Sequence, residues 1–269
     1  MIAALPMYDW PALRRRTDAF WSAAAGNLRA AGIAAPAALA RPAEPAEAWR
    51  DPDLVIGQTC GMPYVMGLCG EARVIGRPDY GLADASEGTY RSVVVVRAEG
   101  GAGGLPAREG CRVAVNEWAS YSGHIALRAH LTALRDGAGG PFFGAALLSG
   151  SHRESARMVA RGAADLAALD AVAWALLEAH EPETAARLAV LDRTAPAPAL
   201  PFITAARFAP LGARLIQALD RATAALPATP GLPRRIFAAS DRDYEPVRAA
   251  ARRAAREPFA PGAPLAPPV

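Results

Sequence analysis

The sequence predicts the α/β fold class, with mostly parallel sheets that are covered by helices on both faces. Three observations support this: short apolar runs typical of buried strands, helical periodicity in the segments that follow them, and an alternation of the two along the chain. Residues 2–7, for example, form an apolar run of the kind found in a fully buried strand. At 269 residues, the chain is long enough for one large domain or two lobes.

The first third of the chain contains predicted strands at residues 2–7, 54–58, 73–75 and 90–97. A helix is predicted between the first two strands, because Asp9-Trp10-Pro11 is a typical helix start. Mostly apolar residues then recur on one helical face up to a stop at Gly32, namely Leu13, Thr17, Phe20, Ala24 and Leu28.

The remaining chain continues the alternation. Strands are predicted at 113–115, 142–148, 165–169 and 188–191, and helices at 171–180, 211–225 and 244–256. A further helix is expected to begin near Ser122, and another at Ser151, where Ser-x-x-Glu with Glu154 indicates a capping box. The proline-rich end is expected to be poorly ordered from about Pro258.

Composition excludes several classes of function. With 52% hydrophobic and 20% charged residues, the chain is globular and not disordered. All 29 basic residues are arginine, which indicates a codon bias and not a device for binding phosphate. The formal net charge is only +3, and the short basic runs are not interleaved with aromatic residues. Nucleic acid is therefore not an expected partner.

Targeting and metal signals are also missing from the sequence. The first residues lack a basic segment and a long apolar run, and no stretch of about 18 apolar residues follows. We therefore expect a cytoplasmic protein without a membrane span. The cysteines are odd in number, Cys60 and Cys69 lack a Cys-x-x-Cys pattern, and His124 and His130 do not share a helical face. No disulfide framework, metal or cofactor is expected.

Isolated polar residues follow the predicted strands, where ligands of α/β proteins bind. Two of these positions also open helices, whose first backbone N–H groups lack partners inside the helix and favour an anion. Plain helix capping is the alternative for the serines and the aspartate. These strand-end residues are Tyr8, Thr59, Ser120, Ser122, His152 and Asp170, with Gly123 beside the serines.

Six motifs, in this order, resemble the phosphate-, phosphite- and phosphonate-binding proteins of ABC transporters. The similarity extends from about residue 3 to 250. The motifs are Pro6-Met7-Tyr8-Asp9, Gln58-Thr59-Cys60-Gly61-x-Pro63-Tyr64, Tyr90-Arg91-Ser92-Val93, Asn116-Glu117-x-x-Ser120-x-Ser122-Gly123, Gly150-Ser151-His152-x-x-Ser155, and Asp165-Leu-Ala-Ala-Leu-Asp170-Ala.

The resemblance implies the type II periplasmic-binding-protein fold, with two lobes joined by two crossover strands. Lobe one is then expected at residues 1–92 plus 206–269, and lobe two at 98–199. The crossover strands are expected near 93–97 and 200–205.

The same resemblance implies a ligand site. Ser120, Ser122 and Gly123 match the helix start that binds phosphoryl oxygens in the family, and Tyr121 lies between them. His152 matches a second helix-start contact. Tyr8, Thr59 and Tyr90 lie where contacts from the first lobe and the hinge are expected. Asp170 matches an acidic position that faces the amino group in members that bind aminophosphonates. The implied partners are a small anionic ligand and an ABC permease.

Three functions remain open at this point. The first is a non-catalytic binding protein for a small oxyanion. The second is a cytoplasmic enzyme on the same fold, with Cys60 as a thiolate nucleophile or Ser120 or Ser122 acting with His152 and Asp170. A buried inert thiol is the alternative for Cys60, and no Gly-x-Ser-x-Gly motif supports the hydrolase. The third is a cytoplasmic ligand sensor.

Overall fold

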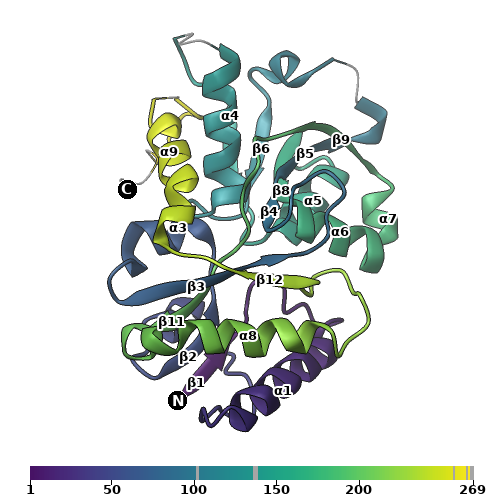
Figure 1. Ribbon diagram of the computed structural model, residues 1–269. Helices are drawn as coiled ribbons and strands as arrows, with labels where there is room; N and C mark the ends of the chain where they lie inside the picture. The colour runs from purple at the N-terminus through teal and green to yellow at the C-terminus, as the bar shows by residue number, and fades with distance from the viewer. Residues whose placement is uncertain (101–102, 136–138, 257, 265, 267–269) are drawn as a thin grey trace. The chain divides into compact units, whose positions relative to one another are not determined.

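The computed structural model describes residues 1–100, 103–135, 139–256, 258–264 and 266. The chain forms two compact units (Figure 1). Unit 1 contains Met1–Thr89 and Pro198–Glu245, and unit 2 contains Tyr90–Ala197 and Pro246–Val269. The chain therefore passes from one unit to the other at three points. Two of them fall within the short strands β4 (Thr89–Tyr90) and β10 (Ala197–Pro198).

These units differ from the expected lobes at the C-terminal end, since residues 206–269 were all expected in lobe one. The segment after Glu245 belongs to unit 2 because its backbone is bonded there: the amides of Phe142 and Phe143 donate to the carbonyls of Pro258 and Phe259, at 3.2 and 2.9 Å. Phe259 is 2% exposed and packs edge to face on Phe143. The expectation of poor order from Pro258 is thus wrong for the described residues of this segment.

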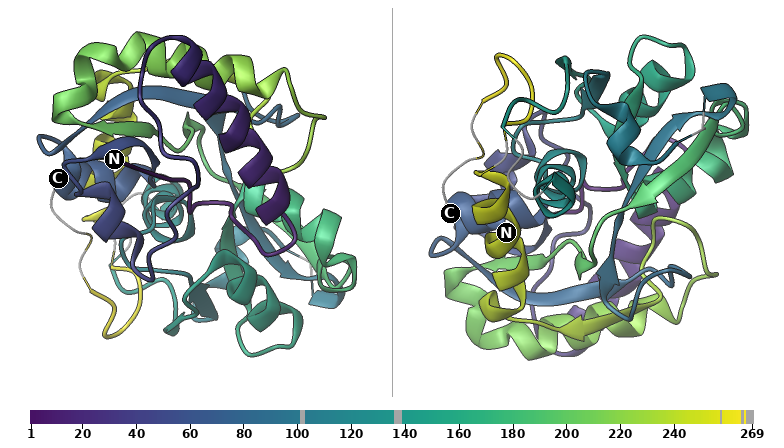
Figure 2. Two further views of the ribbon diagram at one scale, coloured as in Figure 1. Left: turned by 90° about the horizontal axis from the view of Figure 1, so that it is seen from below. Right: turned by 90° about the horizontal axis from the view of Figure 1, so that it is seen from above.

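Unit 1 contains a five-stranded sheet with the order β1-β2-β11-β3-β12. Its strands are β1 (Ile2–Ala4), β2 (Leu54–Gln58), β11 (Phe202–Ala205), β3 (Ala72–Asp79) and β12 (Arg235–Ala238). Two long helices, α1 (Arg14–Ala30) and α8 (Gly212–Thr223), pack against each other on this sheet, and the left view of Figure 2 shows both in front.

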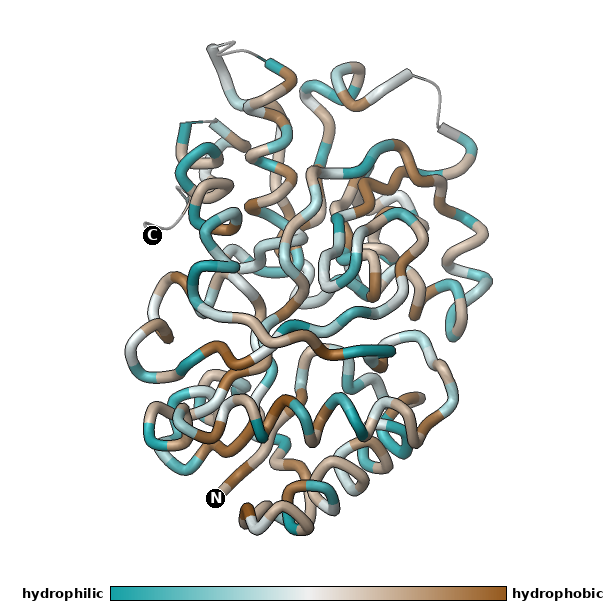
Figure 3. The backbone as a smooth tube through the Cα atoms, viewed as in Figure 1, coloured by the Kyte–Doolittle hydropathy of each residue, from teal (hydrophilic) through white to brown (hydrophobic). Residues whose placement is uncertain are grey.

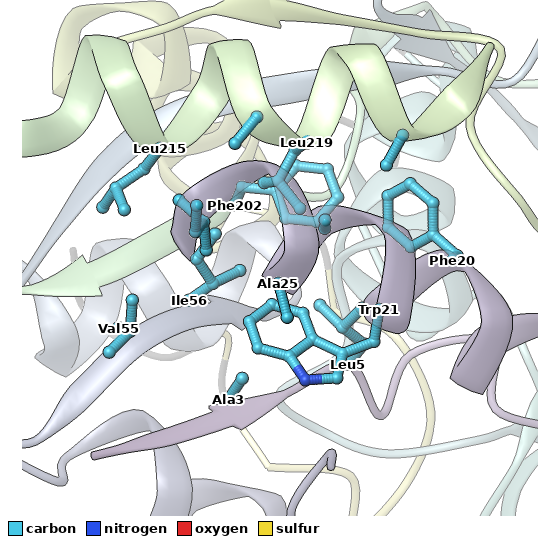
Figure 4. Close-up of a cluster of buried hydrophobic side chains, with 14 of the residues drawn as sticks. Ala3, Leu5, Phe20, Trp21, Ala25, Val55, Ile56, Phe202, Leu215 and Leu219 are labelled. Atoms are coloured by element: carbon cyan, nitrogen blue, oxygen red, sulfur yellow. The ribbon is translucent and has the colours of Figure 1, made fainter. Parts of the chain in front are cut away.

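The core of unit 1 lies between this helix pair and the sheet. Figure 4 shows Trp21 of α1 and Leu219 of α8 directed toward Ile56 and Phe202. Hydrophobic and hydrophilic residues alternate along α8 (Figure 3), as expected for a helix with one buried face. The predicted periodic helix before Gly32 is confirmed, and Gly32 has the positive φ of 73° that glycine tolerates after a helix end.

Shorter elements complete unit 1. They are α2 (Pro45–Trp49), α3 (Gly61–Pro63), the π-helical turn η1 (Tyr64–Leu68), and the 3-10 turns η5 (Ala206–Leu211) and η6 (Asp241–Tyr244).

Unit 2 contains a second five-stranded sheet, with the order β7-β6-β8-β5-β9. Val94 and Val96 of β5 pack in one core cluster with Leu127 and Leu131 of α4, while Val93 and Val95 are equally buried on the other face. α5 and α6 contact β5 and β8 as well. The strands are β5 (Ser92–Arg97), β6 (Arg112–Val115), β7 (Ala145–Leu148), β8 (Leu166–Asp170) and β9 (Leu188–Arg193).

The helices of unit 2 follow its strands. They are α4 (Ala126–Arg135), α5 (His152–Ala160), α6 (Ala171–His180), α7 (Pro182–Ala185) and α9 (Glu245–Ala254), which begins at the last crossing point. Two 3-10 turns, η2 (Ala98–Gly100) and η3 (Leu105–Arg108), and the π-helical turn η4 (Tyr121–Ile125) complete the unit. No helix in the described ranges is both long enough and apolar enough to cross a bilayer.

The α/β class is confirmed, but the expectation of mostly parallel sheets needs a correction, because both sheets are mixed. Within the part of the chain that the structure describes, the parallel strand pairs are β1 with β2, β6 with β7, and β6 with β8. The pairs that involve β5, β11 or β12 are antiparallel.

The direction of β5 and β11 follows from where the chain enters each unit. β5 begins two residues after the crossing at Tyr90, and Ser92 pairs with Asp170 at the carboxyl end of β8. Phe202 of β11 likewise pairs with Gln58 at the carboxyl end of β2. The chain thus enters each sheet at the edge where the parallel strands end, so the entering strand must run against them.

Candidate functional site

The predicted site residues divide between the two units, and each unit is described by itself. Unit 1 contains Tyr8 and Thr59. Unit 2 contains the rest, and three of its helix starts lie side by side because β7, β6 and β8 are neighbours and end at the same edge. The residues in unit 2 are Tyr90, Ser120, Tyr121, Ser122, Gly123, His152 and Asp170.

The first helix start follows β6, and Ser120 is its N-cap. The Ser120 Oγ accepts a hydrogen bond from the Gly123 amide at 3.1 Å, and its carbonyl accepts from the Ile125 amide at 3.2 Å. The sequence suggested that the Gly123 N–H faces a ligand. In the structure this N–H donates to Ser120 within the protein. The hydroxyl hydrogen of Ser120 is not used by this bond, since the oxygen acts as the acceptor.

Gly123 is required by close packing. A Cβ at this position would lie 1.7 Å from the Oδ1 of Asn116 and 3.1 Å from the Cε1 of His152. Asn116 is 9% exposed, its Oδ1 is buried without a hydrogen-bond partner, and its carbonyl accepts from the Gly150 amide at 3.0 Å. Asn116 therefore fixes the loops of the first two helix starts against each other. It occurs in a family-like motif of the sequence, but its position in this packing was not predicted.

The second helix start follows β7 and contributes His152. The Ser122 Oγ and the His152 Nε2 are 3.0 Å apart. Burial lowers the pKa of His152 to about 4, and the neighbouring backbone of Ala168 offsets part of this effect. The imidazole is therefore neutral at pH 7 and fixes the Ser122 hydroxyl through one hydrogen bond.

Capping at this second helix start is simpler than predicted. The Ser151 Oγ accepts from the Glu154 amide at 3.1 Å, as expected for an N-cap serine. The Glu154 carboxylate, however, forms an ion pair with Arg161 at 2.7 Å. The serine half of the predicted capping box is thus present, and the glutamate is held by an arginine.

The third helix start, at α6, is occupied by the protein itself. The Oδ1 of Asp170 accepts from the amides of Val172 and Ala173 at 2.7 and 3.3 Å, and Asp170 is 2% exposed. A carboxylate already sits where an anion would bind, so this helix start disfavours a second anion. Ser92, which pairs with Asp170 across the sheet, has a buried hydroxyl without a hydrogen-bond partner.

Two tyrosines flank this edge of unit 2. The rings of Tyr90 and Tyr121 are 6.4 Å apart at 51°, and both side chains are buried. Tyr121 precedes Ser122 in the first helix turn. The structure therefore brings Tyr90 and the first helix start together.

In unit 1, Tyr8 is held by a residue that sequence reasoning missed. Its ring packs edge to face on Tyr80 at 5.2 Å, and the Tyr80 hydroxyl accepts from the Gln58 Nε2 at 2.8 Å. Tyr80 follows β3 and Gln58 ends β2, so the strand-end rule that identified Thr59 also applies to them. The side chains of Tyr8, Tyr80 and Gln58 line a cavity of about 20 Å³, which is room for one water molecule.

Thr59, for which a ligand contact is predicted, is buried and hydrogen-bonded within the protein. It is 0% exposed, its amide donates to the Pro201 carbonyl at 3.1 Å, and its hydroxyl reaches the Cys60 carbonyl at 3.4 Å. These bonds serve the loop that follows β2.

The Ser-His-Asp arrangement of a hydrolase is only partly matched. Ser122 and His152 are bonded, but the Nδ1 of His152 is buried without a hydrogen-bond partner, and Asp170 caps α6. In a hydrolase a carboxylate orients the histidine. Cys60 is half-buried. Within the described residues, no three His, Cys, Asp or Glu side chains gather as metal ligands.

Comparisons with known proteins agree with this arrangement. The sequence model of one family, the periplasmic substrate-binding proteins of phosphonate ABC transporters, matches residues 34–251. No curated protein sequence matches the chain.

Several solved structures share the fold. A binding-protein component of a phosphonate transporter from Pseudomonas aeruginosa superposes with a TM-score of 0.70 at 14% identity, covering 95% of this chain and 87% of that one. A Xanthomonas citri protein bound to ATP gives 0.68 at 17% identity, with 94% and 97% covered. A Prochlorococcus marinus protein in complex with methylphosphonate gives 0.69 at 16% identity, with 93% and 96% covered. The two-lobe periplasmic-binding-protein fold expected from the sequence is thereby confirmed.

Proposed function

Because the chain belongs to the family of periplasmic substrate-binding proteins of phosphonate ABC transporters, we propose that it binds a small phosphorus oxyanion and that unit 2 holds the phosphoryl group. The single observation that supports this most is the bond between Ser122 and His152, which joins two helix starts at one sheet edge. The protein of Prochlorococcus marinus in the comparison was solved with methylphosphonate, which is a ligand of this chemical class.

The donors proposed for the phosphoryl oxygens are uncharged. They are the hydroxyls of Ser120 and Ser122 and the first backbone amides of the two helices, which have no acceptor inside a helix. Hydrogen bonds from neutral donors to an anion are charge-assisted and individually strong, so a buried counter-charge is not required. Gly123 lets the loop approach closely, since a Cβ at this position would overlap the Asn116 Oδ1.

His152 acts in this proposal through Ser122. A neutral imidazole whose Nε2 carries the hydrogen donates to the Ser122 Oγ, and the serine then turns its own hydrogen toward the anion. Since the pKa of His152 is lowered to about 4, this arrangement persists across the physiological pH range.

The remaining predicted residues have proposed roles around the organic group of the ligand. Tyr90 and Tyr121 provide an aromatic wall in unit 2, and Tyr8 provides one in unit 1. Asp170 adds a fixed negative charge beside the anion site, which favours a ligand with an ammonium group. Thr59 supports the loop of unit 1 through its backbone bonds.

An ABC permease is the proposed protein partner, since the family serves such transporters. The cytoplasmic location expected from the sequence stays a prediction, and fractionation of cells that carry a tagged full chain tests it.

Calorimetry tests the proposed function. We expect binding of at least one of phosphate, phosphite, methylphosphonate and 2-aminoethylphosphonate. Ser122→Ala should weaken it by about tenfold or more, because one charge-assisted hydrogen bond contributes about 1.5–3 kcal/mol. The matched control is Ser86→Ala, an exposed serine of unit 1, which should leave affinity unchanged. Failure of all four ligands to bind at millimolar concentration would overturn the proposal.

A further inference from the structure

The first turn of α1 carries a run of arginines that the fold does not explain. The run is Arg14, Arg15 and Arg16, and this turn contains no acidic residue. Cations at the N-terminal end of a helix face the positive end of its dipole, which costs stability. Arg16 donates to the Thr229 hydroxyl at 2.6 Å, whereas the exposed side chains of Arg14 and Arg15 have no hydrogen bond or ion pair in the described ranges. Folding therefore does not account for Arg14 and Arg15.

Arg14 differs from Arg15 because it lines a cavity of about 200 Å³. One water molecule needs only about 10–15 Å³, so this cavity is large enough for a side chain. Its floor is apolar, since Leu5 and Leu39 belong to the core of unit 1, in which Figure 4 shows Leu5. The other residues that line it, all in unit 1, are Pro6, Asp9, Ala40, Arg41 and Pro42.

The walls of this cavity are fixed by bonds within unit 1. The Ala40 amide donates to the Ala3 carbonyl of β1 at 2.7 Å. Arg41 donates to both carboxylate oxygens of Asp9, at 2.6 and 3.3 Å, and to Asp18 of α1 at 2.7 Å. These bonds join the loop around Arg41 to the strand and to the helix, so the cavity is preformed.

The unused charge at this cavity is positive. Both oxygens of Asp9 are taken by Arg41, and the Asp9 side chain is only 10% exposed. The Nη1 of Arg41 and the whole Arg14 guanidinium make no hydrogen bond within the described residues. An occupant therefore meets unused guanidinium N–H groups together with an apolar floor. A carboxylate matches the flat fork of a guanidinium with two hydrogen bonds.

We propose that this cavity is the docking site for an acidic segment of the ABC permease, in which a glutamate or aspartate lies beside apolar side chains. The carboxylate pairs with Arg14, and the apolar side chains cover Leu5 and Leu39. A small inorganic anion would leave the apolar part of the lining uncovered. A flat membrane surface would not enter a concave site. Both the charge and the shape of the cavity therefore favour a protein segment.

The position of the cavity suits a transporter partner. Leu5, Pro6 and Asp9 belong to the segment that carries Tyr8, a proposed ligand contact of unit 1. Leu5 also lines the small cavity beside Tyr8. A permease segment docked here contacts residues on either side of that tyrosine, as a partner that distinguishes the loaded protein from the empty one requires. This identification of the partner rests on the proposed function.

Binding of two peptides to the full chain tests the docking site. The probe is acetyl-Leu-Glu-Phe-Glu-Leu-amide, and its neutral counterpart has glutamine in place of both glutamates. The acidic peptide should bind about tenfold or more tightly, and Arg14→Gln should remove this preference. Arg15→Gln is the matched control and should keep it, because Arg15 is exposed in the same helix turn and does not line the cavity. Equal affinity for both peptides, or an equal loss in both variants, would overturn the proposal.

The permease itself, reconstituted in lipid nanodiscs, provides a second measurement. Its affinity for the full chain should fall by about tenfold or more in Arg14→Glu and stay within about twofold in Arg15→Glu. Vesicles of phosphatidylglycerol test the alternative partner. Binding to these vesicles that falls equally in both variants, with no difference between the variants in permease binding, would assign the arginine run to membranes and overturn the proposal.

Calorimetry with methylphosphonate separates this proposal from the proposed function. Arg14→Gln should bind methylphosphonate as tightly as the wild type, since Arg14 has no part in the phosphoryl site. If the wild type binds none of the four phosphorus ligands but still binds the acidic peptide through Arg14, the proposed function fails and the cavity keeps its acidic partner. If the four-ligand test succeeds and the peptide preference is absent, the docking site alone fails.

Discussion

Unit 1 and unit 2 each contain a mixed five-stranded sheet, but the edges at which their parallel strands end differ in chemistry. The edge of unit 2 carries three helix starts, two capped by serine and one by aspartate. The edge of unit 1 carries the Tyr8–Tyr80 pair and Gln58. The same topology thus supports hydroxyl and backbone amide donors in one unit and aromatic rings with a side-chain amide in the other.

This difference separates two tasks. Helix starts provide donors at fixed backbone positions, which suit the small and symmetric phosphoryl group. Side chains on strand ends vary without changing the backbone, which suits the variable organic group of a ligand. Substitutions in unit 2 should therefore change affinity for all ligands, and substitutions in unit 1 should change selectivity.

The largest effect is expected for Gly123→Ala. The added Cβ would overlap the Asn116 Oδ1, so the loops that precede η4 and α5 would have to move apart. We expect affinity for every ligand to fall by about 100-fold or more, with a loss of unfolding free energy of about 1–3 kcal/mol. Calorimetry and denaturant unfolding measure the two effects.

Gly26→Ala is the matched control, because Gly26 lies within α1 and a Cβ there meets nothing within 4 Å. It should stabilise the protein by about 0.5–1 kcal/mol and leave ligand affinity unchanged. Comparable binding by Gly123→Ala and the wild type would contradict the packing described for the first helix start.

A second prediction concerns pH and the buried histidines of unit 2. Burial lowers the pKa of His152 and that of His124 to about 4, whereas the unfolded chain takes up these protons near pH 6.5. The unfolded state therefore binds more protons in between, and the histidine contribution to stability should fall as the pH drops from 6.5 to 4 and level off below. Unfolding at several pH values measures the slope.

Variants identify the source of this slope. His124→Gln and His152→Gln should each reduce it, and His130→Gln serves as the control because His130 is more exposed and bonded to Asp192 at 2.9 Å. If the unfolding free energy falls with pH equally steeply after both substitutions, other titratable groups cause the loss of stability.

Asp170→Asn removes the negative charge at the third helix start and keeps a capping side chain. Asparagine caps helices about as well as aspartate, so unfolding free energy should change by only about 0.5 kcal/mol. Loss of the negative charge should lower affinity for 2-aminoethylphosphonate by about tenfold relative to methylphosphonate. An unchanged ratio of the two affinities would remove the ammonium role of Asp170.

The smallest effect is expected for Tyr80→Phe in unit 1. The ring that packs on Tyr8 is kept, and the hydrogen bond from Gln58 is lost. Stability should fall by about 0.5–1.5 kcal/mol, and affinity for phosphate should stay within about twofold. A large loss of phosphate affinity, measured by calorimetry, would show that the two edges do not have separate tasks.

Local signals in the sequence predicted the helix starts well, because a cap depends on a few neighbouring residues. Ser120, Ser151 and Asp170 all cap helices where the pattern placed them. Strand positions were predicted similarly, and β2 spans the expected residues 54–58. Whether the capping residues also bind a ligand is not a local property, and it stays a prediction.

Features that depend on distant segments were not predicted. The antiparallel direction of β5 and β11 follows from where the chain enters each unit, which no periodicity records. The bonds of Pro258 and Phe259 to residues 142 and 143 join segments far apart in sequence.

The third passage of the chain between the units has a consequence for biosynthesis. All five strands of the unit 2 sheet have been synthesised once Arg193 is translated, yet the carbonyls that receive the amides of Phe142 and Phe143 belong to residues made much later. Nascent unit 2 therefore lacks the segment that accepts these two hydrogen bonds, and one apolar flank stays uncovered while most of the second half of unit 1 is synthesised. A ribosome stalled shortly after Glu245 should hold a chain whose unit 2 is far more sensitive to protease than the released protein.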